Sequence, residues 1–149
     1  MIAASEPDFC IVSHITIWSY WFVIQFLLEW LADDSIFNKE SLIDTFLNAG
    51  KISLELRKKG LTKKIKSDNT PVSNGDLEVN RIVTEKIKSL TPLIPIISEE
   101  TTENKSNTNL EDFWLIDPID GTYDYINNLE EFTINAGLIL KRKPVAGLI

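Results

Sequence analysis

Cysteine and histidine are almost absent from this 149-residue sequence, which contains one of each, Cys10 and His14. A single cysteine excludes an internal disulfide and a thiolate metal cluster. A single histidine excludes any site that needs two imidazoles. A hydrolytic site in this chain must therefore be built from carboxylates and hydroxyls, for which hard divalent metals are the natural cofactors.

Positive charge is also scarce, since 15 Lys and Arg stand against 22 Asp and Glu, for a net charge of −7. Nothing in this balance resembles a basic footprint, so we expect no nucleic-acid partner. Hydrophobic residues make up 44% of the chain and charged residues 25%, which is typical of a globular protein with a buried core. The length suits one ordinary domain or a piece of a larger one.

The first 38 residues contain no Lys or Arg, and the segment FCIVSHITIWSYWFVIQFLL within them contains no charged residue. Its length is close to that of a bilayer span, and its tryptophans suit a membrane interface. The lack of a positive n-region disfavours a secretory signal. Three interpretations of residues 1–37 stay open: a membrane association through residues 9–31, a buried extension, or a segment outside the native fold. We therefore expect a cytoplasmic protein that is free, peripheral or anchored at the inner membrane.

Residues 38–149 show the patterns of an α+β domain. Apolar and small residues at helical spacing predict one helix from Lys39 to a stop at Gly60. A second stripe predicts a helix from about Asp76 to Leu90, with Ser73 and Asp76 at the spacing of a capping box. Asp76 is therefore interpreted as a helix cap rather than as a site residue.

Short apolar runs predict the strands of this domain. LIPIIS, which ends at Ser98, and FWLID, which ends at Asp117, both lead into carboxylates. The C-terminal stretch EFTINAGLILKRKPVAGLI predicts two strands joined by a turn at Lys141 to Pro144. The polar tract TTENKSNTNLED between the first two runs is interpreted as a loop.

Carboxylates follow both of these predicted strands: Glu99 and Glu100 follow the first, and Asp117 and Asp120 the second. If the two strands are neighbours in a sheet, the acids gather at one edge. Like charges at that distance repel unless cations occupy the space between them. Asp and Glu oxygens are the ligands that Mg²⁺ requires.

The stretch DPIDGT, which begins at Asp117, contains two backbone devices. Pro118 bends the chain, which would turn the carbonyl of Ile119 toward the same cation. Gly121 and Thr122 would open a short helix, TYDYINN, whose free N–H groups suit a phosphate. The stretch is interpreted as a metal–phosphate corner, although for D-x-x-D-G taken alone ordinary turn chemistry is the stronger interpretation.

The segment WLIDPIDGT resembles the signature of the inositol monophosphatase superfamily, the lithium-sensitive, Mg²⁺-dependent phosphatases. Three flanking segments, IKSDNTPVSNGDLEVNRIV, LTPLIPIISEE and EEFTINAGLIL, fall in the family's order and at its spacing. The resemblance thus covers about residues 39–149, and its D-x-T-P-V-S-x-x-D element is similar to the 3′(2′),5′-bisphosphate nucleotidase branch. It implies a partial sugar-phosphatase fold, in which N-terminal helices pack on a mostly antiparallel sheet and the C-terminal α/β domain is missing.

The resemblance implies a role for each residue of this corner. It implies metal ligands at four positions: Glu99, Asp117, Asp120 and the backbone carbonyl of Ile119. Gly121 and Thr122 would present N–H groups to the substrate phosphate. The Thr122 hydroxyl, paired with Asp68, would help to activate an attacking water that Glu99 helps to orient. Tyr125 matches an aromatic position that packs behind the signature.

The implied reaction is hydrolysis of a small-molecule phosphate ester by Mg²⁺-activated water. In the nucleotidase branch this converts adenosine 3′,5′-bisphosphate to AMP and phosphate. An inositol- or histidinol-phosphate phosphatase of the same superfamily is an alternative. Residues 38–149 have no counterpart of a further metal-ligand aspartate that the family carries in a W-D motif. A catalytically inactive metal-binding fragment is therefore the other alternative.

Overall fold

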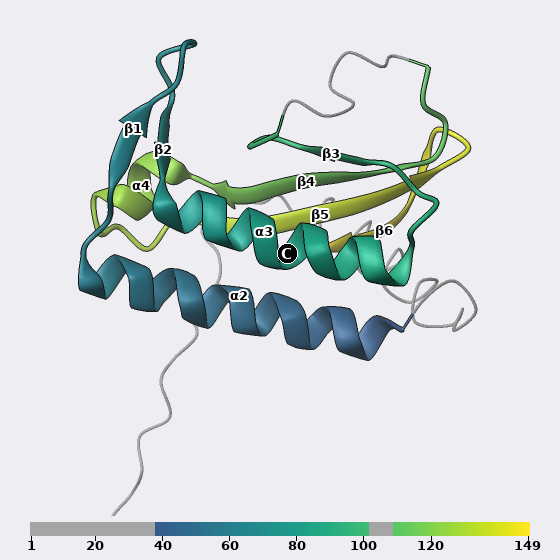
Figure 1. Cartoon of the computed structure of the whole chain (residues 1–149), viewed down its shortest axis with the longest axis horizontal. Helices are drawn as coiled ribbons and strands as arrows, with labels where there is room; N and C mark the ends of the chain where they lie inside the picture. The colour runs from purple at the N-terminus through teal and green to yellow at the C-terminus, as the bar shows by residue number, and fades with distance from the viewer. Residues whose placement is uncertain (1–37, 102–108) are drawn as a thin grey trace, which may run out of the picture.

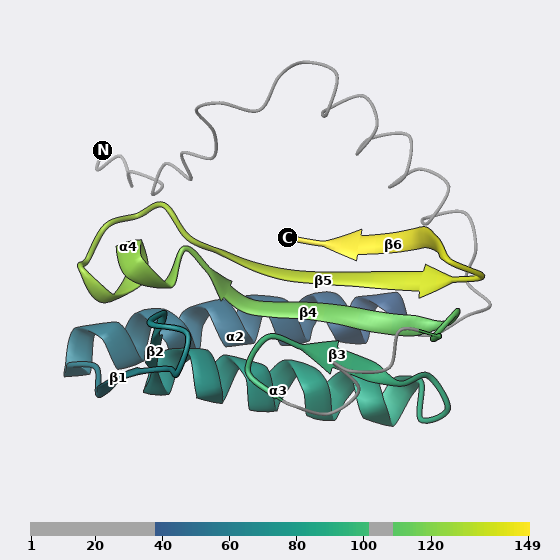
Figure 2. The ribbon, with the colours of Figure 1, turned by 90° about the horizontal axis from the view of Figure 1, so that it is seen from above.

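A computed structural model of the chain describes residues 38–101 and 109–149 (Figure 1). Two helices lie side by side along one face of a four-stranded sheet (Figures 1 and 2). A small two-stranded hairpin and a short helix lie together at one end of this arrangement. The predicted hydrophobic extension at 1–37 lies outside the described residues, and so does the stretch 9–31, for which a membrane association is one of the open interpretations.

The first helix, α2, spans Lys39–Lys59, as its apolar stripe predicts. Asn38 caps it by accepting a hydrogen bond from the backbone N–H of Ser41 at 2.9 Å. Three basic residues occupy the last turn, where the helix dipole favours cations. Gly60 ends the helix with a φ of 97°, a conformation that a glycine adopts at little cost.

The second helix, α3, spans Asn74–Leu90 and begins two residues before the predicted start. Ser73 is its N-cap, and the predicted capping box is confirmed, because the Ser73 backbone N–H donates to Asp76 Oδ2 at 2.8 Å. Val79, Val83 and Ile87 form its buried stripe. Both predicted helices are thus confirmed, together with the capping role of Asp76.

The main sheet has the order β3-β4-β5-β6. β3 is parallel to β4, and the other two pairings are antiparallel, so the predicted mostly antiparallel sheet is confirmed. The turn between the last two strands has positive φ at Lys141 and Arg142, as a tight two-residue hairpin loop requires. The strands span Ile96–Ser98 (β3), Phe113–Asp120 (β4), Thr133–Leu140 (β5) and Lys143–Leu148 (β6).

An antiparallel hairpin that the sequence patterns do not predict precedes α3. It pairs β1 (Lys63–Ile65) with β2 (Pro71–Ser73). Each strand has three residues and β1 is exposed throughout, so no apolar alternation signals it. The Lys66 N–H donates to the Thr70 carbonyl at 2.8 Å and closes the loop. This hairpin carries Lys66 toward the predicted carboxylates.

The core lies between the two helices and the sheet. Trp114 is fully buried, and its indole Nε1 donates to the Thr91 hydroxyl at 3.0 Å. Tyr125 is also buried, as predicted, and its hydroxyl donates to the Ser53 carbonyl at 2.7 Å. The cluster comprises Leu42, Ala49, Val79, Val83, Ile87, Trp114, Ile116, Ile119, Tyr125, Ile134, Ala136, Leu138 and Ala146.

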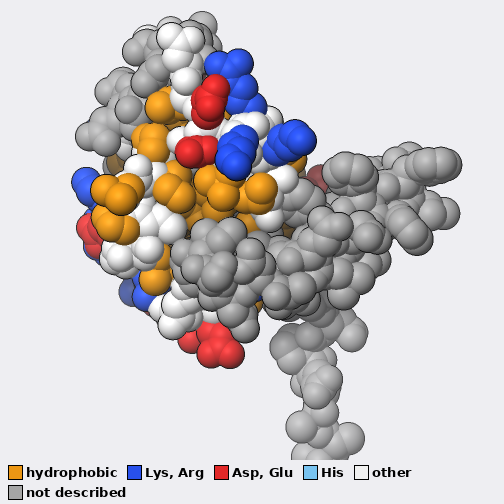
Figure 3. Space-filling view, turned by 90° about the vertical axis from the view of Figure 1, so that its right-hand side faces the viewer, with side chains coloured by type: hydrophobic (Ala, Val, Ile, Leu, Met, Phe, Trp, Pro, Cys, Tyr) orange, Lys and Arg blue, Asp and Glu red, His pale blue; other side chains and the backbone are white. Residues whose placement is uncertain are grey.

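The end of the molecule where β5 turns into β6 faces the viewer in Figure 3. Hydrophobic side chains gather on it, with acidic and basic side chains beside them. The short helix α4 (Thr122–Ile126) and the β1–β2 hairpin lie at the opposite end, where β4 ends (Figure 1). Within 38–101 and 109–149, no helix has both the length and the apolar character that a membrane crossing needs.

Candidate functional site

The carboxylates that the sequence predicts at one sheet edge do follow adjacent strand ends. β3 and β4 run parallel with Ser98 opposite Ile116, and the Glu99 N–H donates to the Ile116 carbonyl at 3.0 Å. The buried Ser98 hydroxyl donates to Asn80 Oδ1 of α3 at 2.6 Å, which fixes this strand end against the helix. Glu99 therefore lies beside Asp117, as the parallel pairing requires.

Lys66 of the hairpin provides a cation for both glutamates. Its Nζ lies 2.9 Å from Glu99 Oε1 and 2.7 Å from Glu100 Oε1. The Glu100 side chain is only 5% exposed, against 44% for Glu99. Burial raises the pKa of the Glu100 carboxyl, and the hydrogen bond from Lys66 opposes this shift. A role for Lys66 was missed from the sequence, because the hairpin that brings it here leaves no periodic signal.

Asp117 lies in the most acidic part of this corner. Burial, followed by the charge and hydrogen bond of Glu99 and the charges of Asp120 and Glu100, raises its pKa to about 7. One of its oxygens, Oδ1, is buried without a hydrogen-bond partner. A buried carboxylate oxygen without a donor is costly, and a bound cation would relieve both the missing partner and the repulsion.

A divalent cation therefore fits the chemistry of this corner, which offers only oxygen donors. As the side chains stand, however, no group of three or more acidic, cysteine or histidine side chains in the described ranges is arranged to hold a metal ion. Lys66 already neutralises Glu99 and Glu100 there. The four predicted metal ligands, Glu99, Asp117, Ile119 and Asp120, stay a prediction.

The prediction that Thr122 pairs with Asp68 is wrong. The Thr122 hydroxyl lies 3.0 Å from Asp76 Oδ1 and 2.9 Å from the Ile119 carbonyl. Asp68 is exposed in the hairpin loop, where its Oδ1 accepts from the Thr70 N–H and hydroxyl at 3.0 and 2.6 Å. A short local turn thus uses the Asp68 carboxylate, as aspartates in turns commonly do.

Asp76 serves two elements at once. Its Oδ2 accepts from the Ser73 N–H and hydroxyl at 2.8 and 2.6 Å, and its Oδ1 is left to face Thr122. The residue is fully buried. Its identification as a cap rather than a site residue is therefore incomplete, because a capping box of this kind occupies one carboxylate oxygen and leaves the other available.

Gly121 sets the entry into α4. It adopts a φ of 87°, and a Cβ there would lie 2.6 Å from the Glu131 carbonyl oxygen, so only glycine fits. The predicted bend after Asp117 takes the form of a register shift between Asp117 and Asp120 within β4. The short helix predicted after Gly121 is confirmed as Thr122–Ile126. Phosphate binding by the Gly121 and Thr122 N–H groups stays a prediction.

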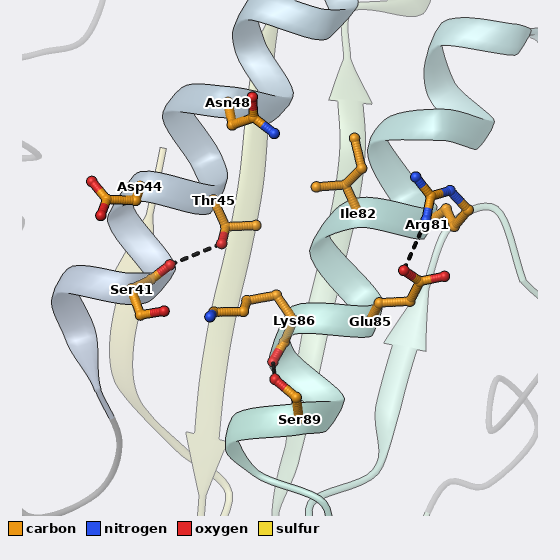
Figure 4. Close-up of a pocket in the computed structure, with 9 residues that line it drawn as sticks. All are labelled: Ser41, Asp44, Thr45, Asn48, Arg81, Ile82, Glu85, Lys86 and Ser89. Carbon is orange, nitrogen blue, oxygen red and sulfur yellow. Dashed lines mark hydrogen bonds and ion pairs between the residues drawn. The ribbon is translucent and has the colours of Figure 1, made fainter.

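A hollow of about 580 Å³ lies elsewhere, between α2 and α3 (Figure 4). Its residues come from these two helices alone: Ser41, Asp44, Thr45, Asn48, Arg81, Ile82, Glu85, Lys86 and Ser89. Arg81 in it is already paired with Glu78 and Glu85. None of Glu99, Asp117 and Asp120 lines it, so the hollow is separate from the carboxylate corner.

Sequence relatives of the chain include bacterial nucleotidases. It is 38% identical over 103 residues to the 3′(2′),5′-bisphosphate nucleotidase CysQ of Haemophilus influenzae, covering 68% of this chain and 38% of that protein. It is 37% identical over 115 residues to the enzyme of the same name from Aggregatibacter actinomycetemcomitans, covering 74% of this chain and 42% of the relative. The chain thus spans about two fifths of the length of these relatives.

Solved structures share the fold. The extragenic suppressor protein suhB of Bartonella henselae superposes with a TM-score of 0.63 at 21% identity, over 72% of this chain and 42% of that one. CysQ of Bacteroides thetaiotaomicron, a member of the inositol monophosphatase family, superposes with a TM-score of 0.50 at 29% identity. The match covers 72% of this chain and 40% of that one. An IMPase/NADP phosphatase solved with Mg²⁺ and phosphate superposes with a TM-score of 0.60 at 23% identity. The match covers 70% of this chain and 40% of that one.

The model of the inositol monophosphatase family matches residues 39–149, which include every described helix and strand and the carboxylate corner. This chain belongs to the inositol monophosphatase family.

Proposed function

We propose that the chain is a Mg²⁺-dependent phosphomonoesterase of the 3′(2′),5′-bisphosphate nucleotidase type. The observation that carries this proposal is the Thr122 hydroxyl, held 3.0 Å from Asp76 Oδ1 and two residues from the acid Asp120. A hydroxyl bonded to a buried carboxylate, next to acids that suit a dication, provides the elements of metal-assisted hydrolysis.

The proton path follows from the contacts of Thr122. Its hydroxyl has one proton to donate, and two acceptors lie within reach, Asp76 Oδ1 at 3.0 Å and the Ile119 carbonyl at 2.9 Å. The proposed path uses Asp76, because a carboxylate can take up the proton and a backbone carbonyl cannot. The oxygen then accepts a proton from a water on its other side. Asp76 is held rigidly for this task, because its second oxygen is bonded to Ser73. Thr122 is thus the group that orients the attacking water, and Asp76 receives the proton.

Glu99, Asp117, Asp120 and the Ile119 carbonyl are the residues that would hold the metal. A bound dication would lower the pKa of the attacking water and neutralise charge on the phosphate. The Mg²⁺ and phosphate named in the IMPase/NADP phosphatase structure support this choice of cofactor. Adenosine 3′,5′-bisphosphate is the proposed substrate, since the relatives at 37–38% identity are nucleotidases of that type.

A second candidate is a metal-binding chain without turnover. The lack of turnover is favoured by the finding that, within the described parts of the chain, no group of three or more acidic, cysteine or histidine side chains is arranged ready to hold a metal ion. The expected cytoplasmic location, with or without a membrane contact through residues 9–31, remains part of the proposal.

Phosphate release by the purified chain tests these candidates. Adenosine 3′,5′-bisphosphate and inositol 1-phosphate are supplied separately with Mg²⁺, and the Asp117→Asn variant serves as the control. Release that needs Asp117 and prefers the bisphosphate supports the nucleotidase. A preference for inositol 1-phosphate favours an inositol phosphatase instead. A folded chain that binds Mg²⁺ and releases no phosphate from either ester is the metal-binding candidate.

A further inference from the structure

Asn135 of β5 lies directly across the sheet from Asp117, as the register of the antiparallel β4–β5 pair shows. Side chains of residues opposite each other in such a pair project from the same face, with Cβ atoms about 5 Å apart. The Asn135 side chain therefore lies on the face from which the Asp117 carboxylate projects. No sequence motif singles it out, because its position becomes visible only once the strand register is known.

The Asn135 amide makes one polar contact and lacks another. Its Nδ2 lies 3.4 Å from Asp120 Oδ2, to which it donates a long hydrogen bond. Its Oδ1 is buried without a partner, and the same is true of Asp117 Oδ1. Among the described residues these two oxygens are the buried side-chain polar atoms without a hydrogen bond. Both are acceptors, so neither can satisfy the other.

Each of these acceptors lacks a donor or cation, and because the two residues face each other across the sheet, one cation could serve both. An amide oxygen is well suited to this place, because it adds a ligand without adding charge. Glu99, Glu100, Asp117 and Asp120 already crowd the corner with four carboxylates, and a further carboxylate would increase their repulsion. The amide nitrogen also donates to Asp120, and the residue that carries it lies opposite Asp117 in the strand register.

We propose that Asn135 is a further oxygen ligand of the divalent cation at this corner, direct or through one bound water, and that it positions Asp120. This inference rests on the proposed metal-dependent function. It assigns to β5 a contribution to a site whose other predicted ligands come from the β3 and β4 ends. A structural alternative is a water held between the two oxygens, with no part in metal binding.

The role of Asn135 as a metal ligand is tested by measuring Mn²⁺ binding to the full chain. Isothermal titration calorimetry gives the affinity, and the electron paramagnetic resonance signal of free Mn²⁺ measures the unbound ion. Asn135→Leu removes the amide at nearly constant volume. Asn48→Leu, on the exposed face of α2, is the matched control. We expect Asn135→Leu to weaken Mn²⁺ binding about 10- to 100-fold, as loss of a ligand or its neighbour commonly does. We expect its metal-free thermal midpoint to be unchanged or higher, because an unpaired buried oxygen is removed.

A second variant covers the case in which Asn135→Leu does not fold. Asn135→Asp keeps an oxygen in place but removes the donor to Asp120 and adds a charge. It should lower the metal-free thermal midpoint, and Mn²⁺ should bind at least as tightly as to the unsubstituted chain and restore the midpoint. Binding more than about 10-fold weaker in Asn135→Asp contradicts the ligand role.

The outcomes separate the two proposals. Equal Mn²⁺ affinity in Asn135→Leu and Asn48→Leu overturns the role of Asn135 alone. A lowered metal-free midpoint with unchanged affinity in Asn135→Leu indicates the structural water and also overturns it. Failure of the unsubstituted chain to bind Mn²⁺ overturns the metal-dependent function together with this inference.

Discussion

The Thr122 hydroxyl lies 3.0 Å from Oδ1 of Asp76, a residue that caps α3 through its other oxygen. One buried carboxylate thus joins the start of a long helix to the start of α4, across 46 positions of the sequence. The geometry of the helix cap sets the position of the proposed proton acceptor. Folding of α3 and formation of the site are therefore coupled.

Replacement of Asp76 by asparagine should disable the site and weaken the cap. The amide keeps the shape but no longer accepts a proton, so we expect phosphate release to fall about 100-fold or more. Unfolding in urea should show a loss of about 1 kcal/mol from the cap. Asp68→Asn is the matched control and should leave the release rate unchanged. A rate that responds to Asp68 and ignores Asp76 would restore the pairing predicted from the sequence.

Ser73→Ala separates the two roles of Asp76. It removes the hydroxyl that bonds Asp76 Oδ2 and should cost about 1 kcal/mol of stability, as the loss of an N-cap does. It leaves the Thr122 contact with Oδ1 in place. We expect the release rate to stay within about threefold of the unsubstituted chain at a temperature where both are folded. A loss as large as that of Asp76→Asn would mean that capping alone explains the effect.

The pH dependence of stability should report on Asp117. Its pKa is raised to about 7 in the folded chain from an ordinary value of 3.8, so folding favours the protonated form. The contribution of Asp117 to the stability of the metal-free chain is accordingly fully present below the ordinary value, and it is lost as the pH rises through about 7. Asp117→Asn should remove this loss and be more stable at pH 8 by about 1 kcal/mol after allowance for solvent screening.

Urea unfolding between pH 4 and pH 8, in chelator and then in Mg²⁺, measures this effect. Mg²⁺ should remove the pH-dependent loss in the unsubstituted chain, because a bound dication favours ionised Asp117. If the free energy of unfolding changes equally with pH in the unsubstituted chain and in Asp117→Asn, Asp117 is not the group responsible.

Lys66→Met should lower the free energy of unfolding, because it leaves the buried Glu100 carboxylate without its ion-pair partner. The ion pair at 2.7 Å is lost and a 5% exposed carboxylate is left without its cation. We expect a loss of about 2 kcal/mol in the absence of metal, with a larger stabilisation by Mg²⁺ than in the unsubstituted chain. Lys63→Met, which removes only a contact with the Ile126 carbonyl, is the control. Equal effects of Mg²⁺ on the two variants would contradict this account of Lys66.

Replacement by alanine should have opposite effects on stability at two glycines, Gly121 and Gly50. Gly121→Ala places a Cβ 2.6 Å from the Glu131 carbonyl oxygen at a φ of 87°, and should destabilise the chain by about 2 kcal/mol or more. Gly50 lies inside α2 with nothing within 4 Å of a built Cβ. Gly50→Ala should therefore stabilise the chain by about 0.5–1 kcal/mol. Thermal melts of both variants check the contrast, and a stable Gly121→Ala would contradict the described turn.

The regular elements were predictable because their signals are local. Helical stripes, capping residues and short apolar runs give α2, α3 and the strands of the main sheet. The β1–β2 hairpin was not predictable, since three-residue strands carry no period. The contact of Thr122 with Asp76 and the ion pairs of Lys66 depend on how distant elements pack. The sequence favoured Asp68 as the partner of Thr122, but local hydrogen bonds hold the Asp68 carboxylate in a turn.

The measurement that bears most directly on the proposed function is phosphate release from adenosine 3′,5′-bisphosphate by the purified chain, with and without Mg²⁺, compared with the Thr122→Val variant. Valine keeps the shape of threonine and removes the hydroxyl bonded to Asp76. We predict Mg²⁺-dependent release that falls about 100-fold or more in Thr122→Val. Release of equal rate in both folded chains, or none from the unsubstituted chain in saturating Mg²⁺, would contradict the proposed enzyme.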